Sequence, residues 1–324
     1  MKIVIIGGGP AGSTAARALA PYHDVTIVQN RPDFDKPCGG GVKTKIFDEF
    51  SIPKSLIKHS LDHVYMIYKN DKIKIDLNGE NLSIVKRAEF DEKLRNLAVQ
   101  AGAKIIYGRF KTFHNKKAVI KTREKDILLE YDILIAADGV NSTVRKAVNI
   151  SQIPSTITHY ARTDGYKVKT CEFFFDFNIG GEYYAWAFPH ENLTHLGTVS
   201  RKNFENLCHY LNLSLKPKGY KIPTWERDII IQKENIYFVG DAAGQVMPLS
   251  FEGIYYAIKS ADLLANCILE NKNYPNEWNK RFFKEFSLMK KLEALNKTFI
   301  RGFVVKAHKL KLIQNFSVKM WLGE

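Results

Sequence analysis

Cysteine is scarce in this sequence, and the few cysteines lie far apart. The chain of 324 residues has four, at Cys38, Cys171, Cys208 and Cys267. No two of them form a Cys-x-x-Cys motif, which argues against a zinc site or a dithiol redox pair. We therefore expect no bound metal. A chain with so few cysteines also favours an intracellular, reducing setting.

Long apolar segments are absent as well. No stretch of about 18 uncharged apolar residues occurs, so we expect no transmembrane helix. The apolar N-terminus, residues 2–6, runs directly into glycines and lacks the hydrophobic core and cleavage site of a signal peptide. These features predict a cytoplasmic protein.

Acidic residues are too few to balance the basic ones. The chain has 48 Lys and Arg against 34 Asp and Glu, a net charge of +14. Such an excess favours anionic partners, among them phospholipids and phosphorylated substrates. A generally lysine-rich proteome explains it equally well. No RNP motif or zinc finger occurs, so we expect no nucleic-acid partner.

The N-terminus carries a dinucleotide-binding pattern. A β-branched run at residues 2–6 is followed by glycines, an alanine-rich segment at 13–20 and a second strand-like run at 25–28. This βαβ context is the one that the G-x-G-x-x-G motif requires. The residues that we expect to bind the cofactor pyrophosphate are Gly7, Gly9, Pro10, Ala11 and Gly12.

Each residue type has a physical role in this loop. Gly7 allows a tight turn, Gly9 lets the backbone approach a pyrophosphate, and Gly12 allows close contact between helix and strand. Pro10 stands near the helix start, where its missing N–H costs nothing. The free N–H groups of the first turn then attract phosphate.

The second strand ends in Gln29, followed by Asn30. The ribose-binding residue at this place is usually acidic. A glutamine can still accept a hydrogen bond from a ribose hydroxyl, although without a charge. We therefore expect Gln29 and Asn30 to bind the adenosine ribose.

Two later segments distinguish FAD from NAD. One strand-like run leads to Asp138-Gly139, and another, beginning at Ile236, leads to Gly240-Asp241. The second is followed by Gly253-Ile254 and a helical stretch to about residue 268. The sequence here resembles the FAD-dependent reductase and hydroxylase superfamily, which has the glutathione-reductase-type Rossmann fold.

That resemblance implies specific contacts. Asp241 is expected at the ribityl chain of FAD, and the helix beginning at Gly253-Ile254 is expected to point its N-terminus at the flavin pyrimidine edge. A positive helix end there stabilises the anionic reduced flavin. No second G-x-G-x-x-G occurs, so no dedicated NAD(P)H domain is evident.

Three segments narrow the resemblance further: Cys38-Gly39-Gly40-Gly41, the run from Gly180 to Pro189, and residues 240–258. Together they resemble the geranylgeranyl reductase family, which includes the archaeal digeranylgeranylglycerophospholipid reductases. The resemblance covers roughly residues 1–270. The family has a P-x-x-Y-x-W-x-F-P substrate motif, in which Gly181 replaces the first proline. The residues that match it are Tyr184, Trp186, Phe188 and Pro189.

The resemblance assigns roles that each have a plainer alternative. The Cys-Gly-Gly-Gly loop is expected near the flavin, because Gly39, Gly40 and Gly41 permit close approach to a flat ring. The candidate catalytic residues are Cys38, Tyr184 and Trp186. Alternatively, Cys38 is a small packing residue.

The four residues that match the aromatic motif, Tyr184, Trp186, Phe188 and Pro189, are the candidates for substrate binding. Tyr184, Trp186 and Phe188 alternate in the sequence, so on a strand they face one side together. They form either an aromatic wall for an apolar chain or part of a sheet core.

Arg87 begins a helical pattern that continues through Phe90, Asp91 and Leu94. In related flavoproteins an arginine at this place lies near the cofactor phosphates, so we expect Arg87 to bind them. The alternative is an ordinary surface arginine.

The predicted fold is α/β, with a Rossmann-type FAD domain, an inserted, mostly β substrate domain and a helical C-terminal tail. The FAD domain is expected to be discontinuous, at residues 1–45, 85–150 and 226–270. The substrate domain is assigned to 46–84 and 151–225, and the helical tail to 271–324.

The end of the tail, residues 281–324, holds ten Lys and Arg against three Glu. Large apolar residues are interleaved with them, as in basic amphipathic helices that lie on anionic membranes. A helix packed on the domain with a solvated lysine face is the other interpretation. These apolar residues are Phe282, Phe283, Phe286, Leu288, Phe299, Phe303, Leu310, Leu312, Phe316 and Trp321.

The sequence thus predicts a non-covalently bound FAD and a reductase that saturates C=C bonds of an isoprenoid chain by hydride transfer. The expected partners are a prenyl lipid and, through the tail, the inner face of a membrane. NAD(P)H and a ferredoxin-like protein remain alternative reductants. Two other functions stay open: a flavin hydroxylase or halogenase of the same fold, and an electron carrier to a membrane quinone.

Overall fold

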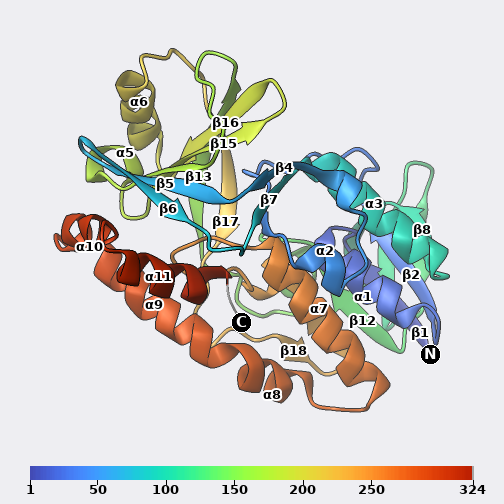
Figure 1. Cartoon of the computed structure of the whole chain (residues 1–324). Helices are drawn as coiled ribbons and strands as arrows, with labels where there is room; N and C mark the ends of the chain where they lie inside the picture. The colour runs from blue at the N-terminus through green and yellow to red at the C-terminus, as the bar shows by residue number, and fades with distance from the viewer. Residues whose placement is uncertain (323–324) are drawn as a thin grey trace. The chain divides into compact units, whose positions relative to one another are not determined.

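The computed structural model describes residues 1–322, which form two compact units (Figure 1). Both units are discontinuous in sequence. The first contains Met1–Asp35, Ala88–Ser155 and Ile222–Met289, and the second contains Lys36–Arg87, Thr156–Lys221 and the described residues from Lys290 onward.

A six-stranded sheet forms the centre of the first unit. Its strand order is β18-β19-β12-β1-β2-β8, and all neighbours are parallel except β18 and β19. Parallel pairing brings the carboxyl ends of β1, β2, β12 and β19 to one edge, where open α/β sheets bind ligands. The strands are β1 (Lys2–Ile6), β2 (Asp24–Gln29), β8 (Lys104–Tyr107), β12 (Ile133–Ala136), β18 (Gln232–Lys233) and β19 (Ile236–Phe238).

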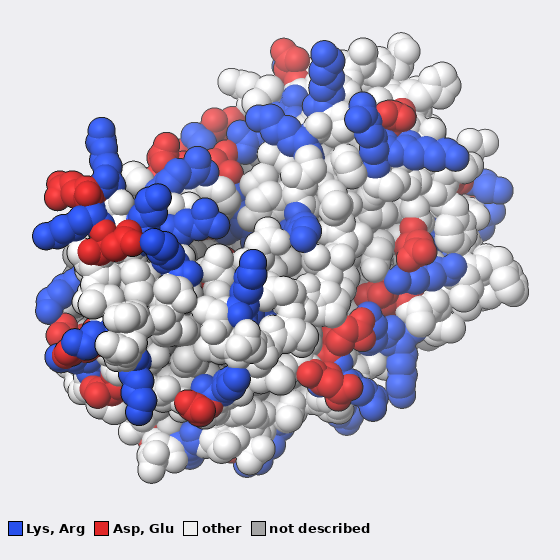
Figure 2. Space-filling view, turned by 180° about the vertical axis from the view of Figure 1, so that it is seen from behind, with Lys and Arg blue, Asp and Glu red and all other residues white. Residues whose placement is uncertain are grey.

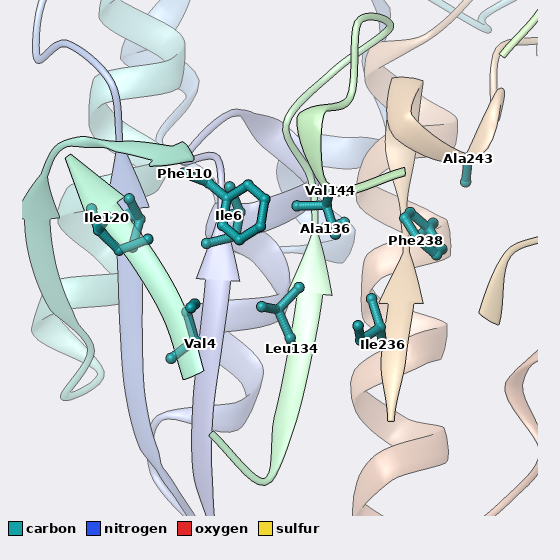
Figure 3. Packing of buried hydrophobic residues seen from close by; sticks show 12 residues of the cluster. Val4, Ile6, Phe110, Ile120, Leu134, Ala136, Val144, Ile236, Phe238 and Ala243 are labelled. Carbon is teal, nitrogen blue, oxygen red and sulfur yellow. The ribbon is translucent and has the colours of Figure 1, made fainter. Parts of the chain in front are cut away.

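Alternate residues of this sheet build a hydrophobic core on one face (Figure 3). Side chains from β1, β12 and β19 pack there against Phe110 and Ile120 of a three-stranded antiparallel sheet. Burying each large apolar side chain contributes roughly 1.5–3 kcal/mol. The small sheet consists of β9 (Arg109–His114), β10 (Lys117–Lys121) and β11 (Asp126–Leu129).

Helices α1 (Pro10–Leu19) and α7 (Ile254–Leu269) pack against each other in the first unit (Figure 1). The small residues of α1, among them Ala15 and Ala16, are fully buried and allow this close approach. Helix α3 (Arg87–Gln100) also belongs to this unit, except for Arg87, which lies one residue before the unit's second segment. The other helices of the unit are α4 (Thr143–Ala147), α8 (Tyr274–Trp278), η2 (Gly240–Ala243) and η3 (Asn279–Phe283).

The second unit is built on a seven-stranded sheet of order β17-β13-β16-β15-β14-β5-β6 and a three-stranded sheet of order β3-β7-β4. The larger sheet contains β5 (His63–Tyr68), β6 (Asp71–Asp76), β13 (Ser155–Thr163), β14 (Glu172–Phe174), β15 (Ala185–His190), β16 (Leu193–Thr198) and β17 (Lys218–Pro223). The smaller sheet contains β3 (Gly41–Lys43), β4 (Ile57–Leu61) and β7 (Leu82–Val85). The short helices α2 (Ile46–Glu49), η1 (Lys54–Leu56), α5 (Phe177–Gly180) and α6 (Arg201–Tyr210) complete its first two segments.

The mixed α/β fold with a helical C-terminal segment is confirmed. The tail continues through α9 (Lys284–Asn296), α10 (Arg301–Ala307) and α11 (Lys311–Leu322), and α10 and α11 pack on strands β5 and β6 (Figure 1). The tail is divided between the units after Met289. No helix among residues 1–322 is both long and apolar enough to cross a bilayer.

Part of the predicted amphipathic surface is packed inside the protein. Phe282 and Phe286 are buried beside Tyr256 and Trp278 in the first unit, with ring centroids 5.0–6.5 Å apart. Trp321 lies edge-on to Phe173, 6.0 Å away. For these three residues the packed-helix interpretation is correct, because each completes an aromatic cluster.

On one face of the protein the positive charge is interspersed with negative charge. On the face seen in Figure 2, Lys and Arg side chains alternate with Asp and Glu, and no single basic patch stands out. Many lysines of the described residues pair with a carboxylate, such as Lys104 with Asp24 at 2.7 Å. Exposed pairs of this kind add about 0–1 kcal/mol each to stability.

Candidate functional site

The glycine loop after β1 is pressed against its neighbours. Gly7 has φ +104°, and a Cβ on it would lie 2.3 Å from the carbonyl oxygen of Ala137. A Cβ on Gly12 would lie 1.9 Å from the carbonyl oxygen of Gly7. No side chain fits at either place, so both glycines are required by the backbone path.

The N-terminus of α1 leaves space for an anion beside its backbone. Gly9 is the N-cap, no side chain caps the helix, and Pro10 follows at its first position. A Cβ on Gly9 would meet nothing within 4 Å. The first N–H groups of a helix have no partner within it. The backbone of Ala11 and Gly12 therefore fits a pyrophosphate at a helix N-terminus.

Gln29 is buried at the end of β2 and holds the loop. Its Oε1 accepts a hydrogen bond from the Gly8 N–H at 2.7 Å, and its Nε2 donates to the Arg31 carbonyl at 2.9 Å. The side-chain amide of Gln29 therefore stabilises the backbone at Gly8 and at Arg31, a role that the sequence did not indicate. Asn30 is exposed. Ribose binding by either residue stays a prediction.

Arg95, a buried residue of α3, belongs to none of the motifs that the sequence revealed. Its guanidinium donates to the carbonyl oxygens of Gly8 at 3.1 Å and Pro32 at 2.8 Å. Arg87 and Asp91 are buried too, and the spacing of four places all three charged residues on one face of the helix. That periodic stripe of charge could have signalled the site. Arg87 itself is the first residue of α3.

Asp138, which follows β12, caps the next helix. Its Oδ2 accepts from the backbone N–H groups of Thr143 at 2.7 Å and Val144 at 3.1 Å. Burial raises the pKa of the carboxyl, and hydrogen bonds from Ser142, Thr143 and Val144 oppose that shift. Gly139 has φ +84° in the turn that follows. A cofactor contact of Asp138 or Gly139 stays a prediction.

Arg145 links helix α4 to the Gly-Asp segment through hydrogen bonds. It is buried on α4 and donates to the carbonyl oxygens of Ile230 at 2.8 Å and Ala242 at 3.1 Å. Its guanidinium lies 4.9 Å from the ring centroid of Phe238. Burial lowers its pKa to about 10, so the group remains a cation at neutral pH.

Three sequence motifs converge at Gly240-Asp241. A Cβ on Gly240 would lie 2.9 Å from the Cβ of Ala11, which places the Gly-Asp turn against the first turn of α1. A Cβ on Gly253 would lie 3.8 Å from Asp241 Oδ1. Gly253 is the N-cap of α7, again without a side-chain cap, and Ile254 is its first residue. Two helix N-termini and a carboxylate therefore meet within the first unit.

In the second unit, the Cys-Gly-Gly-Gly loop contacts the aromatic motif. A Cβ on Gly39 would lie 2.4 Å from Phe188 Cδ2, and one on Gly41 would lie 3.0 Å from Phe188 Cε2. Gly40 has φ +75° and donates its N–H to Cys38 Sγ at 3.3 Å. The Cys-Gly-Gly-Gly loop thus lies directly on the aromatic motif of β15.

The aromatic residues form a cluster around Phe173. Its ring centroid lies 5.4 Å from that of Tyr184 and 5.5 Å from that of Phe188, both edge-on. Trp186 lies over Gly197, where any Cβ would be 2.1 Å from the indole. Tyr184 is buried and stands just before the strand, whereas Trp186 and Phe188 are half-buried. Pro189 is buried, and on a strand it faces the side opposite to Phe188.

The chain matches the FAD binding domain family over residues 1–219. It is 31% identical over 278 residues to the geranylgeranyl diphosphate reductase of Rhodobacter capsulatus, with 78% of this chain and 71% of that protein covered. It is 26% identical to the digeranylgeranylglycerophospholipid reductase of Thermoplasma volcanium, with 94% and 86% covered.

Solved structures share the fold. A geranylgeranyl bacteriochlorophyll reductase-like protein of Thermoplasma acidophilum has a TM-score of 0.79 at 22% identity, covering 92% of this chain and 88% of that one. A flavin-dependent brominase has a TM-score of 0.75 at 14% identity, covering 97% and 94%. Residues 1–219, which match the FAD binding domain family, contain the glycine loop, the Cys-Gly-Gly-Gly loop and the aromatic motif. The chain therefore belongs to the geranylgeranyl reductase family of FAD-binding oxidoreductases.

Proposed function

We propose that this protein is an FAD-dependent reductase that saturates C=C bonds of an isoprenoid chain. The observation that carries the proposal is the pairing of motifs within each unit. Two uncapped helix N-termini meet Asp241 in the first unit, and the Cys38 loop lies on Phe188 in the second. The first arrangement suits a dinucleotide cofactor and the second an apolar chain beside a thiol.

In this proposal the first unit is a glutathione-reductase-type Rossmann domain. Its parallel strand order and its glycine loop at the carboxyl end of β1 support that assignment. The pyrophosphate is assigned to the N–H groups of Ala11 and Gly12, and the ribityl chain to Asp241. The second unit, which interrupts the first in sequence, is assigned to the substrate.

Saturation of an alkene requires a hydride and a proton. Reduced FAD, when bound, supplies the hydride, and the reductant that regenerates it is either NAD(P)H or a ferredoxin-like protein. We assign the proton to the Cys38 thiol. Its sulfur accepts from the Gly40 N–H, so the S–H proton points elsewhere. Isolated alkenes accept hydride poorly, so positioning and exclusion of water by the aromatic cluster must supply much of the catalysis.

The rival within this fold is oxygen chemistry, because a flavin-dependent brominase shares the architecture. A reductase works without oxygen, whereas a halogenase or hydroxylase consumes it. We expect photochemically reduced protein to saturate geranylgeranyl diphosphate anaerobically, with two hydrogens gained per double bond in the mass spectrum. Substrate-dependent oxygen uptake without a saturated product would support the rival. Flavin reoxidation by a quinone, again without a saturated product, would indicate an electron carrier.

A second prediction concerns Arg95. Arg95→Met removes the charged donor to the carbonyl oxygens of Gly8 and Pro32, and of these the Gly8 carbonyl keeps the Ser13 hydroxyl as a donor. Hydrogen bonds from a charged donor are worth about 1.5–3 kcal/mol, so the FAD dissociation constant should rise about tenfold or more. Arg109→Met, at an exposed arginine of the same unit, is the matched control. Fluorescence titration of apoprotein measures both, and equal affinities would mean that Arg95 does not support the cofactor loop.

The tail also supports contact with a bilayer surface. Between residues 299 and 316 five large apolar side chains are strongly exposed. Three lysines of this segment pair with carboxylates, Lys306 and Lys309 with Asp71 and Lys311 with Asp76. These two carboxylates offset part of the local positive charge, and we assign membrane binding mainly to the apolar residues. They are Phe299, Phe303, Leu310, Leu312 and Phe316.

Vesicle co-sedimentation tests this assignment. We expect the protein to sediment with anionic vesicles at low salt and to lose only part of its binding at 1 M salt, where the Debye length is about 3 Å. Replacing Phe299, Phe303, Leu312 and Phe316 by serine should abolish sedimentation.

The control replaces four exposed apolar residues elsewhere, Tyr107, Leu128, Leu193 and Tyr210, by serine. If both quadruple variants sediment like the wild type, residues 299–316 do not contact the bilayer.

A further inference from the structure

Two histidines on neighbouring strands form a stacked pair in the second unit. His190 ends β15, and His195 lies on β16 directly opposite Phe188. Because alternate residues of a strand share a face, His190, His195 and Phe188 lie on one face of this hairpin. The two imidazole rings are parallel within 18°, with centroids 3.6 Å apart.

Both rings hold the backbone of the Cys-Gly-Gly-Gly loop. His195 Nδ1 lies 3.1 Å from the Cys38 carbonyl oxygen, and His190 Nε2 lies 2.9 Å from the Gly39 carbonyl oxygen. A carbonyl oxygen can only accept, so each of these ring nitrogens must carry a proton and donate it. The two histidines therefore donate hydrogen bonds to the carbonyl oxygens of two consecutive residues, Cys38 and Gly39.

The loop that carries these two carbonyls has almost no side chains of its own. Gly39, Gly40 and Gly41 give the backbone unusual freedom, and Gly40 stands at φ +75°. Gly40 and Gly41 are held by β7, because the Val85 N–H donates to the Gly40 carbonyl oxygen at 2.9 Å and Gly41 pairs with Ile84. The preceding residues, Cys38 and Gly39, lie outside that ladder, and the hydrogen bonds of His195 and His190 restrain their carbonyls. The position of the Cys38 thiol then follows from the position of its own backbone.

From this geometry we infer that His190 and His195 are the positioning residues of the reaction. They fix the Cys38–Gly39 backbone and so set where the Cys38 thiol is presented to the substrate. This inference rests on the proposed function, in which that thiol supplies the proton. The histidines themselves act through the loop, and the group they donate to is the backbone.

The test separates the donated hydrogen bond from the bulk of the ring. His195→Ala and His190→Ala remove both. His195→Asn and His190→Gln keep an N–H donor at a position similar to Nδ1 and Nε2. His209→Ala, an exposed histidine on α6 of the same unit, is the control. If an alanine variant does not fold, the leucine variant, which fills the space without a donor, replaces it.

The first readout is alkylation of Cys38 by iodoacetamide in the FAD-loaded protein. Cys38 is half-buried, whereas Cys171, Cys208 and Cys267 are buried, so Cys38 is the thiol that reacts first. Loss of one restraining hydrogen bond should raise local opening, and with it the alkylation rate, about fivefold. We expect kcat for alkene reduction to fall about tenfold in the same variants, with KM and FAD content unchanged.

Rescue decides the outcome. The asparagine and glutamine variants should return alkylation rate and kcat to near the values of the wild type and of His209→Ala. The inference is overturned if the alanine variants match the wild type, or if the amide variants behave like alanine. A wild type that does not reduce a prenyl chain would refute the proposed function instead, and the alkylation series would still judge whether the histidines position the thiol.

Discussion

The structure depends on backbone contacts that only glycine permits. In the first unit a Cβ on Gly12 would lie 1.9 Å from the Gly7 carbonyl oxygen, and one on Gly240 would lie 2.9 Å from Ala11. These two contacts hold the start of α1 against both β1 and the Gly-Asp turn. The uncapped N–H groups of α1 and the carboxylate of Asp241 come together only because no side chain separates them.

The second unit also uses glycines for a close backbone approach, in this case to an aromatic ring. Its glycine loop lies on Phe188, and its C-terminal segment holds the residues before the aromatic motif through Arg301. That guanidinium is buried and donates to the carbonyl oxygens of Phe175, Gly181 and Glu182 at 2.6–3.2 Å. Burial lowers its pKa to about 10, which keeps it charged at neutral pH. The tail is therefore a structural part of the unit that we assign to the substrate.

The features that the sequence predicted are local ones. The strand–glycine–helix pattern around Gly7 and the Gly-Asp turn at Asp241 are short motifs whose spacing reflects their geometry. Arg95 and His195 escaped notice because their partners, Gly8 and Cys38, lie 87 and 157 residues away. For Phe286 the sequence left both a membrane face and a packed face open, because helical periodicity cannot tell one from the other.

The proposed function depends on FAD that the first unit holds through the pyrophosphate site at the start of α1. Chromatography of the cofactor released when the purified protein is denatured tests this binding. We expect a yellow protein that releases FAD and no FMN, because only a dinucleotide carries the pyrophosphate that this loop fits. A colourless protein that fails to bind added FAD would contradict this proposal.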